Sequence, residues 1–437
     1  MKRHIDRRPR EWKESGRRKP LIVRGARQVG KTYSVRQFGQ AHFDQLAAVD
    51  LERNRSIHTV FSGDLDAKRM LAELEVFLDV KITPGKTLLF LDDTQSCPSA
   101  LMALRHFYEE YPDLHVVAAG SLLEFAMSDI SFPVGRMQFL IMHPMTFVEY
   151  LWAIGKENAA EVVLSRPGPV PEATHDLLLN HLRDYSFIGG MPESVKTYSE
   201  TGSLKEAFAV HNDIVESFRQ DLPKYSPRVD SQCLNGVLAG VARNVGNQVI
   251  YSRLADGFSH HTIKKAFDVL CMARIVTRVP SVSPSGLPLG ATASARKIKA
   301  IMLDVGLWQR LSGVNIEAEY PRSDLLDIHR GALAEQFVGQ EMLVSLNTDL
   351  HYWARRARGS TAEVNYLVVV DGAIVPVEVK GGASGRLRSM HLLLGLHPKI
   401  RRGISFSSRM YSELPEQRLQ SVPLYHAYSA TGGSGAA

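Results

Sequence analysis

The chain has 437 residues, of which 44% are hydrophobic and 22% charged. This is the composition of an ordinary folded protein, and it argues against wholesale disorder, a collagen-like repeat or a long coiled coil. The length predicts two to three domains. The net charge is +6, but residues 1–36 alone hold 13 basic and 3 acidic side chains, a balance of +10, so the remainder carries −4. Such a basic block either binds a phosphate polymer or forms a solvated face, and the sequence leaves both interpretations open.

The three cysteines, Cys97, Cys233 and Cys271, lie far apart and form no CxxC pair. This spacing argues against a disulfide framework and against a zinc site. The most apolar stretch, LHVVAAGSLLEFAM at 114–127, is too short to span a bilayer. No apolar core follows the basic N-terminus, so no signal peptide is predicted. We therefore expect a cytoplasmic protein without a membrane partner.

Short apolar runs alternate with amphipathic stretches from Lys19 to about Tyr150, which predicts β-α units on a parallel sheet and an α/β fold. The run from Leu88 to Leu91 is apolar at every position, as in a strand covered by helices on both faces. The strands are predicted at PLIVRG, AAVDLE, TLLFLDD and LHVVAAG, which are residues 20–25, 47–52, 87–93 and 114–120.

The middle of the chain is expected to be helical, with a linker at SRPGPVPEAT (165–174) and helices as far as Tyr225. From residue 231 the pattern predicts a winged helix: a first helix, a second around YSRLADGF, a third in SHHTIKKAFDVLCMA with Ser259 as its N-cap, and a two-stranded wing, IVTRVPSV and KIKAIML. The third helix carries a polar face, opposite its apolar one, that is a candidate DNA-contacting surface: His260, His261, Lys264 and Lys265.

The clearest motif is a phosphate-binding loop that follows the first predicted strand and precedes a helix. It matches GxxxxGK[ST] at every position: Gly25, Ala26, Arg27, Gln28, Val29, Gly30, Lys31 and Thr32. Glycines let the backbone N–H groups and the helix N-terminus point at the phosphates, and Lys31 supplies a charge to the β and γ groups. Thr32 is expected to place its hydroxyl on Mg²⁺. The sequence therefore predicts an ATP site.

A second acidic motif lies at the end of a later strand, where LLFLDDTQ supplies Asp92 for the Mg²⁺ shell and Asp93 to polarise the attacking water. Asp93 is one methylene shorter than the Glu common at this position, which favours slow hydrolysis or switch-like behaviour. Ser121, after VVAAG, is a candidate sensor of the γ-phosphate. Arg136, in FPVGR, is a candidate arginine finger for a neighbouring subunit.

These residues resemble the AAA-type ATPases that carry a C-terminal domain of unknown function, number 4143. The resemblance runs through LIVRGARQVGKT, LLFLDDTQ, AAGSLLEF, FPVGR, HPMTFVEYL, GGMPESV, DIVESFRQDLPKY, LDVGLW, GALAEQFV, EVNYLV and VPVEVK. It implies an ATPase core at 1–154 with its basic N-terminal segment, a helical linker or lid at 155–230, a winged-helix domain at 231–322 and a small α/β domain similar to PD-(D/E)xK nucleases at 323–428. Residues 429–437 are expected to be a disordered tail.

The resemblance to these nucleases also implies a metal site, in which Glu378 and Lys380 share one face of a strand. Glu335, on the preceding helix, is a further candidate ligand. The remaining acidic position is Asn365, and an amide holds a hard cation more weakly than a carboxylate does. We therefore expect a degenerate nuclease, although Glu363, on the same strand face, is a candidate substitute.

The segment from Lys380 to Arg402 has six basic residues and no acidic one, and with Arg355, Arg356 and Arg358 it can follow a phosphate backbone or form solvated loops. Arg386 and Arg388 are the DNA-binding candidates there. The sequence predicts a homo-oligomeric ATPase that uses ATP and Mg²⁺ and acts on DNA, in branched or single-stranded form. Two alternatives remain open: a nucleotide-gated switch acting on protein partners, and an ATP-gated, Mg²⁺-dependent nuclease.

Overall fold

The computed structural model describes residues 1–128, 135–225, 229–320, 330–357, 360–380 and 387–432. The chain divides into two compact units. The first comprises residues 2–143 and 272–274, and the second comprises residues 144–271 and 275–437 together with Met1. Each unit is described by itself.

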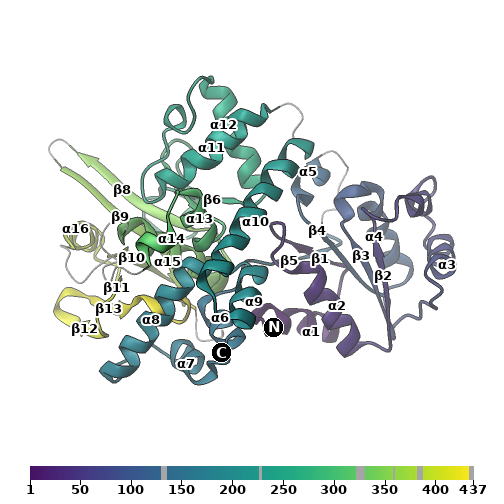
Figure 1. The fold of residues 1–437 in the computed structure, drawn as a ribbon, viewed down its shortest axis with the longest axis horizontal. Helices are drawn as coiled ribbons and strands as arrows, with labels where there is room; N and C mark the ends of the chain where they lie inside the picture. Colours follow the sequence, from purple (N-terminus) through teal and green to yellow (C-terminus); the bar gives the residue numbers. More distant parts are fainter. Residues whose placement is uncertain (129–134, 226–228, 321–329, 358–359, 381–386, 433–437) are drawn as a thin grey trace. The chain divides into compact units, whose positions relative to one another are not determined.

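The first unit is built on a five-stranded sheet in the order β2-β3-β4-β1-β5, and every neighbouring pair in it is parallel (Figure 1). The strands are β1 (Leu21–Arg24), β2 (Gln45–Asp50), β3 (Thr87–Asp92), β4 (His115–Gly120) and β5 (Gln138–Ile141). The predicted α/β class and parallel sheet are confirmed. β5 was not predicted, because it is a four-residue edge strand with no fully buried position.

Helices cover both faces of this sheet, as the uninterrupted burial of β3 requires. Leu89 and Leu91 belong to the core cluster to which α3 and α4 contribute. The opposite face carries Leu88, whose side chain lies against Gly39 of α2. The helical segments of this unit are η1 (His4–Asp6), α1 (Arg7–Glu14), α2 (Lys31–His42), η2 (Arg55–Phe61), α3 (Ala67–Leu78), η3 (Thr94–Ser96), α4 (Pro98–Glu110) and α5 (Leu123–Ser128).

The second unit contains a group of helices that are held together by buried polar side chains. Asp304 caps α13 by accepting the Leu307 N–H at 3.0 Å, and its other oxygen accepts the Gly190 N–H at 2.6 Å. Thr146 and Glu149 form a capping box at the start of α6. These helices are α6 (Phe147–Ala153), α7 (Glu157–Leu164), α8 (Glu172–Ile188), α9 (Pro192–Thr201), α10 (Leu204–Tyr225), α13 (Val305–Leu311) and α14 (Ile316–Glu319).

The region predicted as a winged helix contains α11 (Ser231–Asn244), η4 (Tyr251–Arg253), α12 (His260–Met272) and an antiparallel pair, β6 (Val276–Pro280) and β7 (Ile298–Met302). Ser259 caps α12, since its hydroxyl oxygen accepts the Thr262 N–H at 3.2 Å. The second predicted helix is wrong: only a three-residue 3-10 turn forms there. The polar and Gly-containing segment DGFS ends any helix before it can propagate.

The C-terminal part is a six-stranded mixed sheet in the order β12-β13-β11-β10-β9-β8. Its strands are β8 (His351–Ala357), β9 (Ser360–Val370), β10 (Ala373–Val379), β11 (Gly403–Ser407), β12 (Ser412–Leu414) and β13 (Leu419–Pro423). The remaining elements are η5 (Leu289–Thr292), α15 (Arg330–Leu346), α16 (Arg388–Leu396), η6 (Pro415–Gln417), η7 (Leu424–His426) and α17 (Ala427–Thr431). α17 extends into the predicted disordered tail, because Tyr428 and Thr431 are buried; residues 433–437 lie outside the described part.

None of the helices in the described ranges combines the length and the apolar composition that a membrane span requires.

Candidate functional site

The phosphate-binding loop connects β1 to α2 and has the backbone that the motif requires. Gly30 is the N-cap of α2 with φ 95°, a left-handed conformation that glycine adopts without strain. Gly25 has no room for a side chain, since a Cβ there would lie 2.3 Å from the Met142 carbonyl oxygen. The first N–H groups of α2 have no acceptor within the helix, so they can bind an anion at this end.

Lys31 is folded back over the loop. Its Nζ donates to the carbonyl oxygens of Ala26 at 2.7 Å and Gly25 at 3.1 Å, and the residue is only 8% exposed. Burial lowers the pKa of Lys31 to about 8, although the carboxylates of Asp93 and Asp92 oppose this shift. At neutral pH the ammonium therefore stays charged, and the loop holds it in place above the helix N-terminus.

Asp92 is the last residue of β3, and its carboxylate lies near Thr32, the residue after Lys31. Burial raises the pKa of Asp92 to about 6, and the nearby Thr32 hydroxyl opposes this shift. A hydroxyl and a carboxylate are hard oxygen ligands of the kind that Mg²⁺ prefers. These two residues therefore fit a nucleotide-bound magnesium ion.

Asp93 stands in the left-handed region with φ 49°, and its side chain is held by a residue that sequence reasoning missed. Gln95 Nε2 donates to Asp93 Oδ1 at 2.9 Å. A Cβ on Gly120 would lie 2.3 Å from the side-chain oxygen of Gln95, so this side chain reaches the end of β4. No distinct signal in the sequence pointed to Gln95, because it lies in the polar run DDTQS at 92–96.

The register of the sheet brings these chain segments to one edge. Arg24 pairs with Gly120, so Ser121 follows β4 at the level where the loop follows β1. Ser121 is 2% exposed. Arg136 instead pairs with Glu109 on α4, and more than two fifths of its side chain is exposed. The proposed arginine finger is therefore held by an intramolecular ion pair.

Part of the basic N-terminal block contacts the phosphate-binding loop. Arg3 is buried, and its guanidinium donates to the carbonyl oxygens of Val29 at 3.2 Å and His143 at 2.7 Å. Trp12 is also buried, and its Nε1 donates to the Lys19 carbonyl at 2.7 Å. At least this part of the block is structural, whereas Arg8 and Arg10 are exposed.

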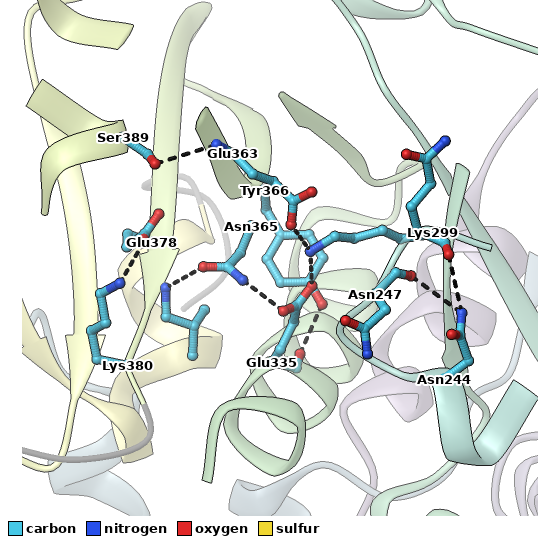
Figure 2. A network of polar contacts seen from close by, with 12 residues as sticks. Asn244, Asn247, Lys299, Glu335, Glu363, Asn365, Tyr366, Glu378, Lys380 and Ser389 are labelled. Atoms are coloured by element: carbon cyan, nitrogen blue, oxygen red, sulfur yellow. Dashed lines mark hydrogen bonds and ion pairs between the residues drawn. The ribbon is translucent and has the colours of Figure 1, made fainter. Parts of the chain in front are cut away.

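A second polar cluster lies in the second unit, where α15, β9 and β10 meet (Figure 2). Glu378 and Lys380 contact each other, with Lys380 Nζ 2.6 Å from Glu378 Oε1. Asn365 Nδ2 donates to Glu335 Oε2 at 2.6 Å, and Asn365 Oδ1 accepts the Val379 N–H at 2.8 Å. The nuclease-like residues predicted from the sequence are thus brought together.

The cluster contains one further residue that was not predicted, Lys299 of β7 (Figure 2). Its Nζ lies 2.8 Å from Glu335 Oε1 and also pairs with Glu363. Within the part of the chain that the structure describes, no group of three or more His, Cys, Asp or Glu side chains has an arrangement that could hold a metal ion.

The predicted DNA-contacting residues lie as follows. His260, His261, Lys264 and Lys265 are exposed on α12, whereas Ile263, Phe267 and Leu270 on the same helix are buried. Arg388 and Arg355 are exposed. Arg386 and Arg358 fall outside the described residues, as does the side chain of Arg356.

Comparison with protein families gives three matches in chain order. An AAA domain matches residues 17–151, a domain of unknown function, DUF8612, matches residues 179–318, and a second one, DUF4143, matches residues 330–425. This chain combines an AAA domain with a DUF4143 domain. The phosphate-binding loop lies within the AAA domain, so the first unit is that of an AAA-type P-loop ATPase. The cluster around Glu335 belongs to the DUF4143 domain, except for Lys299, which comes from the DUF8612 match.

None of the curated proteins compared with this chain matches it. Among solved structures, a Walker-type ATPase of Pyrococcus abyssi is 15% identical with a TM-score of 0.44, over 70% of this chain and 94% of that one. The ORC1 protein of Aeropyrum pernix, solved in complex with DNA, is 11% identical with a TM-score of 0.29, over 73% of this chain and 95% of that one.

Proposed function

We propose that this AAA protein binds and hydrolyses ATP with Mg²⁺, and that it uses this cycle to act on DNA. The observation that carries the ATPase proposal is the buried ammonium of Lys31, which donates to the loop carbonyls of Gly25 and Ala26. The Thr32 hydroxyl follows it in the chain, and the Asp92 carboxylate lies nearby at the end of β3. Cation, hydroxyl and carboxylate are the three groups that a magnesium triphosphate needs in one place.

The residues would divide the work as follows. The N–H groups of the loop from Gly25 to Gly30 bind phosphate oxygens, and Lys31 turns from the loop carbonyls to the β and γ groups. Thr32 and Asp92 hold the magnesium ion, which when bound neutralises the phosphate oxygens. Asp93 orients the attacking water, and Gln95 fixes the Asp93 carboxylate. In this proposal Ser121 senses the γ-phosphate.

The DNA part of the proposal is supported by the two faces of α12. One face is buried in the region predicted as a winged helix, and the other presents two histidines and two lysines to solvent. The acidic residue on the same helix, Asp268, is paired with Arg278. Lysine side chains that contact phosphates give binding without sequence preference. We further propose that the protein works as a homo-oligomer in which Arg136 leaves Glu109 to reach a neighbouring ATP site.

ATP turnover measured with and without single-stranded, duplex, forked and four-way DNA tests the proposal. The wild type should hydrolyse ATP slowly alone and faster with at least one DNA form. Lys31→Ala should lose about 100-fold or more, because one charged donor to the reacting phosphates is removed. The matched control is Lys86→Ala, since Lys86 is exposed and outside the loop.

Two outcomes would contradict the proposal. Turnover that survives Lys31→Ala would place hydrolysis elsewhere or in a contaminant. ATP binding with no stimulation by any DNA, and no DNA binding at low salt, would favour the nucleotide-gated switch acting on protein partners.

A further inference from the structure

The ammonium of Lys299 lies inside the carboxylate cluster of the DUF4143 domain. Lys299 is 2% exposed, and its Nζ contacts Glu335, itself 4% exposed, and Glu363, whose side chain is partly exposed. The ammonium also lies 5.5 Å from the centre of the Tyr352 ring, within cation–π range. A buried lysine with two carboxylates is a compensated charge rather than an accident of packing.

The oxygens of Glu335 are both in use. Oε1 faces Lys299 and Oε2 accepts from Asn365. The orientation of the Asn365 amide follows from chemistry, because the Val379 N–H can only donate, so the atom beside it must be the amide oxygen. The amide nitrogen therefore faces Glu335, and Asn365 offers no oxygen toward the cluster.

The pairing of the strands explains why Asn365 is held in this way. β9 and β10 pair as far as Tyr366 and Val377. Beyond that point the side-chain oxygen of Asn365, instead of a backbone carbonyl, accepts the hydrogen bond from the Val379 N–H. An aspartate at 365 would keep this acceptor but would put a second carboxylate against Glu335.

The charges are nearly balanced without a metal. Three carboxylates, Glu335, Glu363 and Glu378, face two ammonium groups, Lys299 and Lys380. A divalent ion would bring two more positive charges, and it would have to displace the partners of both Glu335 oxygens. Glu378 Oε2 has no hydrogen-bond partner among the described residues, but a single oxygen is too few ligands for such an ion.

We propose that the Lys299 ammonium occupies the position of the catalytic cation in this nuclease-like site, so that the site ties β7 to α15 and β9 and binds no divalent metal. The lysine comes from the wing, and its partners come from the DUF4143 domain. This inference does not depend on ATP binding, and it argues against the ATP-gated nuclease.

Binding of Mn²⁺ to the nucleotide-free full-length protein, followed by electron paramagnetic resonance, tests the proposal. At Mn²⁺ concentrations up to about 1 mM, the weak end of protein cation sites, the wild type and the Glu335→Gln variant should bind the same amount of Mn²⁺. Equal binding would mean that the wild type holds no ion at this cluster. Lys299→Met combined with Asn365→Asp should gain one Mn²⁺ per chain, and added Mn²⁺ should raise its melting temperature. Lys297→Met, two residues away and outside β7, is the matched control and should behave as the wild type.

A wild-type Mn²⁺ site that Glu335→Gln abolishes would overturn the proposal, and so would a folded double variant that gains none. The wild-type measurement decides even if the double variant does not fold.

Thermal unfolding provides an independent readout of the same contact. Lys299→Met leaves the Glu335 carboxylate buried without its ammonium, whereas Lys299→Met with Glu335→Gln removes both charges. The double variant should therefore melt at a higher temperature than Lys299→Met alone. Equal or lower melting of the double variant would mean that the two side chains do not compensate each other, which would contradict the proposal.

Discussion

Gln95 holds the Asp93 carboxylate at the end of β3 through a 2.9 Å hydrogen bond. Asp93 needs this restraint because its left-handed backbone, with φ 49°, does not by itself fix the side chain. Gln95 itself is 7% exposed and lies against Gly120, so it cannot easily turn away. It is a positioning residue for the proposed attack by water.

We expect Gln95→Ala to lower kcat for ATP by about 10-fold to 100-fold, the usual loss when a supporting hydrogen bond behind a functional group is removed. KM should change little, because the phosphate-binding loop is untouched. Steady-state kinetics measures both constants, and Gln37→Ala, an exposed glutamine on α2, is the control. A change confined to KM would assign Gln95 to nucleotide binding instead.

The phosphate-binding residues could be predicted because they are consecutive in the chain and their chemistry is local. Lys299 could not, because its partners Glu335 and Glu363 lie 36 and 64 positions away and are joined to it only by the fold. Its only sequence signal was a lysine between Ile298 and Ala300, in a strand that is buried throughout. A buried charge in such a strand requires a counter-charge, but the pattern does not say which one.

α12 is the element on which the DNA proposal depends. Its buried residues recur at helical spacing, so the exposed lysines are held on a rigid surface. The antiparallel pair β6 and β7 follows α12, as the predicted wing would, and the proposal assigns α12 the role of the DNA-contacting helix.

Replacing Lys264 and Lys265 with alanine should weaken binding to all DNA sequences alike. Each phosphate contact contributes about 0.9 to the slope of log affinity against log salt, so losing both should lower that slope by about 2. Fluorescence anisotropy at several salt concentrations measures the slope. Lys68→Ala with Lys86→Ala, two exposed lysines of the first unit, is the control. An unchanged slope in the α12 variant would remove this helix from the proposed interface.

At the scale of elements, the long periodic or uniformly apolar segments were predictable. β3 and α12 are examples, since each has one dominant pattern over its whole length. The segment at 251–258 was predicted as a helix and is mostly irregular, because the polar and Gly-containing residues DGFS follow the first turn directly and do not extend it. β11 (Gly403–Ser407) was missed because GISFS alternates apolar and small residues over only five positions.

The second unit holds a titratable group at its centre. Glu341 on α15 is 1% exposed, and its Oε1 accepts the Phe147 N–H at the start of α6 at 3.0 Å. Its other oxygen has no hydrogen-bond partner among the residues that the structure describes. Burial raises the pKa of Glu341 to about 8, with Glu149 and Asp304 adding to the effect.

The free energy of unfolding should therefore fall as pH rises. Below the ordinary pKa of 4.5 both states hold the proton; between 4.5 and about 8 the unfolded chain has released it and the folded chain has not. Each pH unit in this window should cost up to about 1.4 kcal/mol. Urea unfolding from pH 5 to about pH 8 measures this dependence.

Glu341→Gln should flatten the dependence, because the amide cannot ionise. Glu416→Gln, at an exposed site, is the control and should follow the wild type. A wild-type stability that rises with pH across the window, or an unchanged slope in the Glu341→Gln variant, would contradict this assignment.

The hydrogen bond from the Asn365 amide to Glu335 also determines how a metal site could be introduced into this cluster. Replacing Lys299 alone would leave a buried carboxylate without its ammonium, and replacing Asn365 with aspartate alone would place two carboxylates next to each other. Each single variant should be less stable than the wild type, so the two changes depend on each other. A designed metal site here therefore requires both substitutions at once.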